Sequence, residues 1–186
     1  MKAVLISIRP EWCAKIASGE KKIEVRKSRP KLTPPFKVYI YCTKDAKKQF
    51  WTGPRYSYAD DHSHNAIDKC GNGKVIGEFL CNQIIEDHTF GHDEKFYSAA
   101  CMSPCDVAAY AVQSPMYGWH IANVKIYDKP RKLNAFYKKC SEYTELGTNC
   151  FDCKYECGTD EVECASEGRL HLHCAPQSWC YVEEQQ

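Results

Sequence analysis

The chain has 186 residues, of which 44% are apolar and 12% aromatic, and its formal net charge is +1. This length suits one domain of ordinary size with an appendage, and the apolar content excludes a wholly disordered chain. No apolar run approaches the length of about eighteen residues that a membrane-spanning helix needs. The apolar stretch near Met1 is too short for a signal peptide, so we expect a cytoplasmic protein.

The small net charge hides a strong asymmetry along the chain. Residues 1–58 hold 14 Lys/Arg and 4 Asp/Glu, a balance of +10, whereas residues 59–186 hold 11 and 20, a balance of −9. A basic half favours a polyanionic partner, because each phosphate that a cation neutralises releases bound counterions. A solvated basic face that the acidic half merely screens is the alternative interpretation.

Hydrophobic periodicity predicts strands and short helices in an order typical of a compact mixed barrel. Apolar residues alternate over 2–8, as in a strand, and Pro10 then fits the first position of a helix that Gly19 ends. A second helix is expected from the capping residue Ser103 to about Gln113. A long polar insertion covers about 44–73. Further strands are expected over residues 23–26, 37–43, 74–85 (bent at Gly77) and 117–127.

The strand over 23–26 carries the first candidate site. Glu24 and Arg26 point to one face of it, and Lys21 and Lys22 lie just before it. A carboxylate between cations can accept hydrogen bonds from a base edge while the cations hold phosphate. The alternative is an internal Glu24–Arg26 ion pair that only orders the rim of the barrel.

Aromatic residues supply further candidates. Trp51 and Tyr56 lie beside Arg55 in the polar insertion and could form a stacking platform for unpaired bases, or a small cluster under the loop. Trp119 is expected in the core, with His120 facing the opposite way, toward the cleft. The ligand-binding residues predicted from the sequence are therefore Lys21, Lys22, Glu24, Arg26, Trp51, Arg55 and His120.

Cysteines crowd the C-terminal end of the chain. There are 13 in all, an odd number without an export signal, which argues against a disulfide scaffold. Cys150 and Cys153 have the spacing of half a zinc knuckle. The segment around them is poor in aliphatic residues, so a bound metal or covalent cross-links must stabilise its fold. Oxidised disulfides and free thiols remain the alternatives. The zinc ligands that we expect are Cys150, Cys153, Cys157 and Cys174, with Cys164 and His173 as further candidates.

The charge of this end differs from that of the N-terminal half. Residues 140–186 hold 2 Lys/Arg against 10 Asp/Glu, a balance of −8. Because the tail is acidic, we do not expect it to bind RNA. It could instead fold over the basic half of the chain or dock another protein.

Several sequence blocks resemble the ASCH family, and they occur in the family's order and spacing. Residues 6–12 and 19–26 resemble its signature around a short helix, in which a Gly-x-Lys-Thr-x-Glu-x-Arg pattern follows the helix. The resemblance covers about residues 2–133 and is closest to ASCH proteins of phages and Gram-positive prophages. The later blocks that carry it are residues 38–42, 75–79, 117–121 and 176–184.

The resemblance implies an α+β fold, a small PUA-like mixed β-barrel with two or three short helices. We expect this barrel over residues 1–135 and an acidic, Cys-rich extension over residues 136–186, whose segment 177–183 returns to the barrel. The family is thought to bind RNA or modified nucleosides in a cleft at the barrel mouth. RNA or a nucleotide is therefore the expected partner, and no membrane is.

Two alternatives from other functional classes stay open. One subclass of the family hydrolyses an acetylated cytidine with a Lys, a Thr and a Glu. Lys21 matches its Lys, but Glu24 stands at its Thr and Lys22 replaces a usual Thr, so an enzyme here would use Lys21 as base and Glu24 or a bound water. Such an enzyme could also act on RNA. The second alternative is a phage accessory factor that binds a host protein through the acidic tail.

Overall fold

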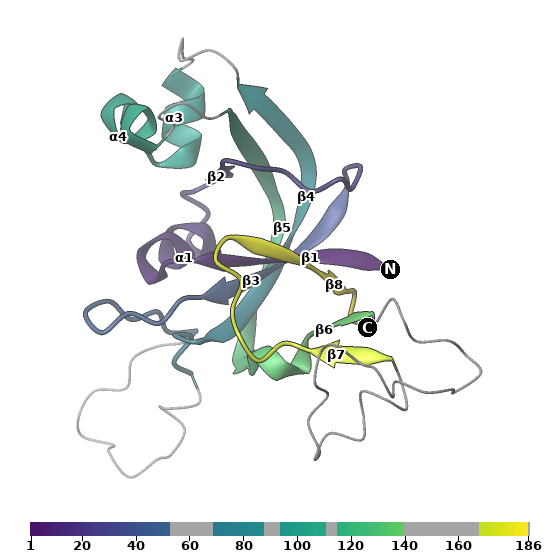
Figure 1. Cartoon of the computed structure of the whole chain (residues 1–186). Coiled ribbons are helices and arrows are strands. Elements are labelled where there is room, and N and C mark those ends of the chain that lie inside the picture. The colour runs from purple at the N-terminus through teal and green to yellow at the C-terminus, as the bar shows by residue number, and fades with distance from the viewer. Residues whose placement is uncertain (53–68, 88–93, 111–114, 140–167, 186) are drawn as a thin grey trace, which may run out of the picture.

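The computed structural model describes residues 1–52, 69–87, 94–110, 115–139 and 168–185. Within these ranges a curved sheet forms the centre of the molecule, and short helices lie at one end of it (Figure 1). No helix in the described ranges is both long and apolar enough to cross a membrane.

The main sheet is mixed and has six strands in the order β2-β5-β4-β3-β1-β8. β1 pairs in parallel with β3 and antiparallel with β8, and the other neighbours are antiparallel. A separate ribbon pairs β6 (Tyr137–Lys139) with β7 (Arg169–His171). The six strands of the main sheet are β1 (Lys2–Ile8), β2 (Ile23–Arg26), β3 (Phe36–Cys42), β4 (Lys74–Asp87), β5 (Met116–Arg131) and β8 (Trp179–Glu183).

The expectation of a closed barrel is wrong in one respect. β2 and β8 are the two edges of the sheet, and no strand pairing joins them in the described part of the chain. The edges still approach each other, since Trp179 Nε1 donates to Ser28 Oγ at 3.0 Å and Arg26 Nη1 to Ser178 Oγ at 3.5 Å. β2 has only 4 residues, so side chains rather than main-chain pairing bridge the gap.

The predicted helices are present, and one more was missed. α1 (Pro10–Ala17) begins at the expected proline, and Gly19 follows it with φ +77°. α4 (Pro104–Tyr110) has the expected cap, because Ser103 Oγ accepts from the Asp106 main-chain nitrogen at 3.1 Å. The expected end of this helix near Gln113 lies outside the described residues. The helix that the sequence did not predict is α3 (Glu94–Ala100), and a short 3-10 turn, η2 (Leu133–Ala135), precedes β6.

β1 buries both of its faces. Val4 and Ile6 of β1 belong to the main core cluster, whereas Leu5 belongs to a second cluster on the other face. Trp119 is fully buried in the main cluster, as expected, and its ring meets Phe36 edge-on at a centroid distance of 6.0 Å. The C-terminal region supplies three buried residues of the second cluster, Phe136, Leu172 and Val182.

At Gly77, where a bend was expected in the strand over 74–85, the pairing of β4 is irregular. The register between β4 and β5 shifts between Val75 and Gly77. A Cβ atom at Gly77 would collide with the main-chain oxygen of Lys125. Glycine therefore allows the two strands to approach closely at this point.

Candidate functional site

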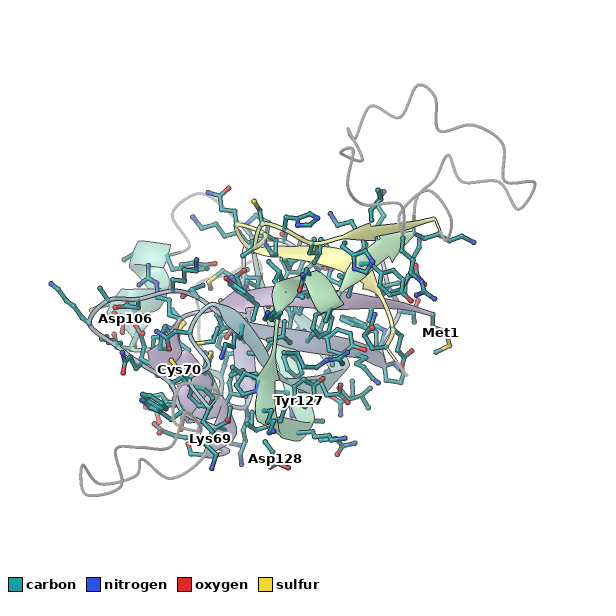
Figure 2. The ribbon with its side chains drawn as sticks, turned by 90° about the horizontal axis from the view of Figure 1, so that it is seen from below. Met1, Lys69, Cys70, Asp106, Tyr127 and Asp128 are labelled. Carbon is teal, nitrogen blue, oxygen red and sulfur yellow. The ribbon has the colours of Figure 1, made fainter. Side chains whose placement is uncertain are left out.

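A cavity of about 620 Å³ lies where the sheet is left open between β2 and β8. Its volume falls within the roughly 300–1,000 Å³ of small-ligand sites in proteins. Figure 2 shows Asp106, one of its lining residues, at the opposite end of the molecule from Met1. The walls come from the end of β1, from α1, β2 and α4, and from Gln177 and Ser178 just before β8.

Glu24 lies in the wall of this cavity and is nearly buried, with 7% of its surface exposed. Its placement follows from strand alternation, because Ile23 and Val25 point into an apolar cluster on the other face of β2. Arg26 Nη2 lies 2.9 Å from Glu24 Oε1, and Lys21 Nζ lies 3.6 Å from Oε2. Oε2 accepts no hydrogen bond from any described residue within the usual distance, and it is itself buried against the Lys21 ammonium.

Lys21 is even more buried, with 4% of its surface exposed. Its Nζ donates to the main-chain oxygen of Ala100 at 2.6 Å and lies 4.9 Å from the centroid of the Trp12 ring. Burial lowers the pKa of Lys21 below its ordinary value of 10.5, and the negative charge of Glu24 opposes this shift. The Glu24 charge therefore favours the charged form of the buried amine and limits the fall in the pKa of Lys21.

Arg26 connects the two edges of the open sheet. Besides its ion pair with Glu24, its Nη2 donates to the main-chain oxygen of Ser7 at 2.7 Å. Its Nε has no hydrogen-bond acceptor among the described residues. The internal ion pair that was the alternative interpretation therefore exists, but it occupies neither Glu24 Oε2 nor Arg26 Nε.

The rim of the cavity is basic. Arg9 and Lys27 are exposed cations that line it. The lining holds four cations in total against two carboxylates, those of Glu24 and Asp106. Asp106 already accepts from Ser103 Oγ at 2.6 Å. This balance favours an anionic ligand.

Of the predicted ligand-binding residues, Lys21, Glu24 and Arg26 come together in the cavity and the others do not. Lys22 has an exposed side chain, and its main chain bonds to Ala99 and Ile121. The imidazole Nδ1 of His120 lies 2.7 Å from Asn82 Oδ1. Trp51 forms an isolated β-bridge with Cys70. None of these three lines the cavity, and Arg55 lies outside the described residues.

The predicted zinc ligands fall mostly where the structure gives no description. Cys150, Cys153 and Cys157 lie outside the described residues, and Cys174 is exposed. Within the described ranges, no group of three or more His, Cys, Asp or Glu side chains is placed to hold a metal ion.

Sequence reasoning missed several residues that complete the cavity. Trp12 could have been recognised, because its helix leads directly into the strand that carries Glu24 and Arg26. Gln177 and Ser178 belong to a segment expected to return to the barrel, but their position in the cavity wall was not predicted, since it depends on the pairing of β8 with β1. Other lining residues that were not predicted are Ser7, Thr43, Met102 and Tyr110.

Comparison with solved structures finds similar proteins at low sequence identity. A crystal structure of ASCH from Zymomonas mobilis is similar, with 17% sequence identity, a TM-score of 0.49, and coverage of 70% of this chain and 73% of that chain. A mutant form of the same Zymomonas mobilis protein gives 17% identity, a TM-score of 0.46, and coverage of 72% and 77%. No curated protein matches the chain.

The structures named here come from a bacterium, so they give no support to the expected kinship with phage proteins. A family model supports the resemblance at the level of the family. The model of the ASCH domain matches residues 6–131, which is more than half of the chain and includes Lys21, Glu24 and Arg26. The chain therefore belongs to the ASCH domain family.

Proposed function

We propose that this protein binds RNA or a modified nucleotide in the cavity between β2 and β8. The observation that carries the proposal is the cavity of about 620 Å³, whose lining holds four cations against two carboxylates. Such a lining attracts an anionic ligand. The Glu24 carboxylate in the wall, paired with Arg26 and Lys21, adds a charged acceptor to this basic site.

A nucleobase fits this chemistry. Amino and imino groups on the edges of bases donate hydrogen bonds to carboxylates. The ring of Trp12 in the cavity wall is partly exposed and offers an apolar surface to a base. Arg9 and Lys27 at the rim are placed to contact the phosphate that accompanies the base.

A binding assay across a salt series tests the proposal. We expect the affinity for 5′-nucleoside monophosphates and short RNA to fall as salt rises, and Arg9→Ala to weaken both. Lys132→Ala is the matched control, because Lys132 is also an exposed cation but does not line the cavity. An affinity that neither salt nor Arg9→Ala changes would contradict the proposal.

Hydrolysis of an acylated nucleoside or of RNA is the second candidate, and one observation favours it. Burial lowers the pKa of Lys21, which increases the population of neutral amine that could act as a base. However, Lys21 Nζ already donates to Ala100, and the neighbouring Glu24 offers no hydroxyl nucleophile. Mass spectrometry of a nucleoside panel and of RNA, incubated with the wild-type protein and with Lys21→Ala, tests it. Turnover that depends on Lys21 would support catalysis, and no turnover would leave binding as the function.

A further inference from the structure

Residues 27–31 form a basic loop that leads away from the cavity. Lys27, Arg29 and Lys31 in this loop are all exposed. The sequence contains no Asp or Glu between Glu24 and Asp45, so no neighbouring carboxylate along this stretch neutralises the three cations.

Two cations of the basic loop lie over aromatic rings. Lys27 Nζ lies 5.2 Å from the centroid of the Tyr110 ring, and the Arg29 guanidinium carbon lies 6.0 Å from that of Tyr117. Both rings are partly exposed. Cations beside partly exposed aromatic rings are a combination by which proteins bind single-stranded nucleic acids.

The basic loop is held in place by β8. Trp179 Nε1 donates to Ser28 Oγ at 3.0 Å, and the main-chain nitrogen of Lys31 donates to the Tyr181 hydroxyl at 2.7 Å. The rings of Trp179 and Tyr181 pack edge-to-face at a centroid distance of 5.5 Å. The main chain of the loop therefore needs little reordering when a ligand binds, which lowers the entropic cost of binding.

The basic loop is also continuous with the cavity, because Lys27 and Ser28 line both. We propose that single-stranded RNA, with one nucleotide in the cavity, continues across the basic loop, where Arg29 and Lys31 contact its phosphates and Tyr117 contacts a base. This inference rests on the proposed function, and it extends the ligand from a nucleotide to a strand. Paired bases hide their faces inside a duplex and cannot reach the aromatic rings, so the surface favours unpaired RNA.

The test compares a mononucleotide with an RNA oligomer of about six nucleotides, a length within the range that single-strand sites cover. Wild-type protein, the double variant Arg29→Ala/Lys31→Ala and the control Lys129→Ala/Lys132→Ala are titrated with both ligands. Both control lysines are exposed, as Arg29 and Lys31 are. None of these four residues lines the cavity. Circular dichroism and thermal melting verify that the variants remain folded.

We expect the oligomer to bind wild-type protein more tightly than the mononucleotide, and Arg29→Ala/Lys31→Ala to remove this advantage while mononucleotide affinity stays unchanged. Two lost phosphate contacts reduce the salt slope for a single strand by about 1.4, so the affinity ratio of wild type to variant grows about sevenfold between about 200 and 50 mM salt. The control variant should keep the wild-type slope.

Several results would overturn the inference. Equal affinity for the mononucleotide and the oligomer would show that RNA does not contact the basic loop. The cavity would then remain as a site for a single nucleotide. A duplex of the same sequence, or poly-glutamate of similar charge, that binds as tightly as the oligomer would exclude recognition of unpaired RNA. If the wild-type protein binds neither RNA ligand, the proposed function fails as well.

Discussion

Arg26 engages one oxygen of the Glu24 carboxylate, and Lys21 faces the other. The guanidinium Nη2 lies 2.9 Å from Glu24 Oε1, whereas Oε2 faces Lys21 Nζ at the longer distance of 3.6 Å. The same Nη2 donates to the main-chain oxygen of Ser7 on β1, so the pair fixes the carboxylate relative to both sides of the cavity. A preorganised, charged acceptor of this kind discriminates between ligands by their donors.

Glu24→Gln tests the role of the carboxylate charge in the cavity wall. The amide keeps nearly the same shape but lacks the negative charge, and it can present a donor where the carboxylate accepts. Hydrogen bonds to charged groups contribute about 1.5–3 kcal/mol, so we expect nucleotide affinity to fall roughly 10- to 100-fold. Calorimetric titration with nucleoside monophosphates measures the change.

Asp106→Asn is the matched control for Glu24→Gln. Asp106 also lines the cavity, but it is exposed and already accepts from Ser103, so its substitution should change affinity little. Because Glu24→Gln leaves Lys21 and Arg26 without their anion, its melting temperature should also fall. A folded Glu24→Gln protein with wild-type affinity would show that the carboxylate does not contact the ligand.

Lys21 predicts a specific dependence of stability on pH. Burial lowers its pKa in the folded protein below 10.5, so between the folded and the unfolded pKa the unfolded chain binds more protons. Stability therefore rises with pH in that interval, as the buried amine becomes neutral. Urea denaturation of wild type and Lys21→Met should show wild type gaining stability relative to the variant as pH rises toward 10.5. A constant difference between the two proteins would contradict the lowered pKa.

Local patterns predicted the elements of the site better than its assembly. Alternation over β2 was sufficient to place Glu24 and Arg26 on one face, because the opposite face carries Ile23 and Val25. The contribution of Ser178 could not be predicted, since 152 positions separate it from Arg26 and only the sheet order brings them together. Closure of the barrel was overestimated for a related reason: strand pairing between the edges depends on geometry that local periodicity does not encode.

Trp51 lies apart from the cavity. Its basic and aromatic neighbours in the sequence predict a stacking platform that includes Arg55, which lies outside the described residues, and Trp51 itself bridges Cys70 and does not line the cavity. The basic and aromatic surface that adjoins the cavity instead combines residues 27–31 with Tyr110 and Tyr117. These tyrosines come from α4 and β5, so proximity along the chain could not identify them.

Gly77→Ala should destabilise the protein strongly. A Cβ atom there meets the main-chain oxygen of Lys125, which cannot move without breaking the β4–β5 pairing. Overpacking of this kind costs about 1–3 kcal/mol. Gly118→Ala is the comparison, because the nearest atom to its Cβ, at 2.7 Å, is on the Phe96 side chain, which can turn aside. Chemical denaturation should give a lower free energy of unfolding for Gly77→Ala than for Gly118→Ala. The reverse order would contradict the close approach of β4 and β5.

The Cys-rich segment predicts a structural metal. We expect about one zinc ion per chain, held by Cys150, Cys153, Cys157 and Cys174 in the tetrahedral arrangement that zinc prefers. Elemental analysis of protein purified without chelator measures it, and Cys153→Ser should lose the metal. A wild-type content below about half an equivalent would contradict a structural zinc. Mass losses that correspond to oxidised cysteine pairs would indicate disulfides instead.

Cysteine reactivity should separate the core of the sheet from its surface. Burial raises the pKa of Cys81 to about 11, and it also raises the pKa of Cys13 well above the ordinary value. Alkylation needs an accessible thiolate, so both cysteines should resist iodoacetamide at neutral pH while the exposed Cys105 is modified. Peptide mapping by mass spectrometry after timed labelling gives the order, and denaturant should remove the protection. Equal labelling of Cys81 and Cys105 in the native protein would show that β4 is not part of a closed core.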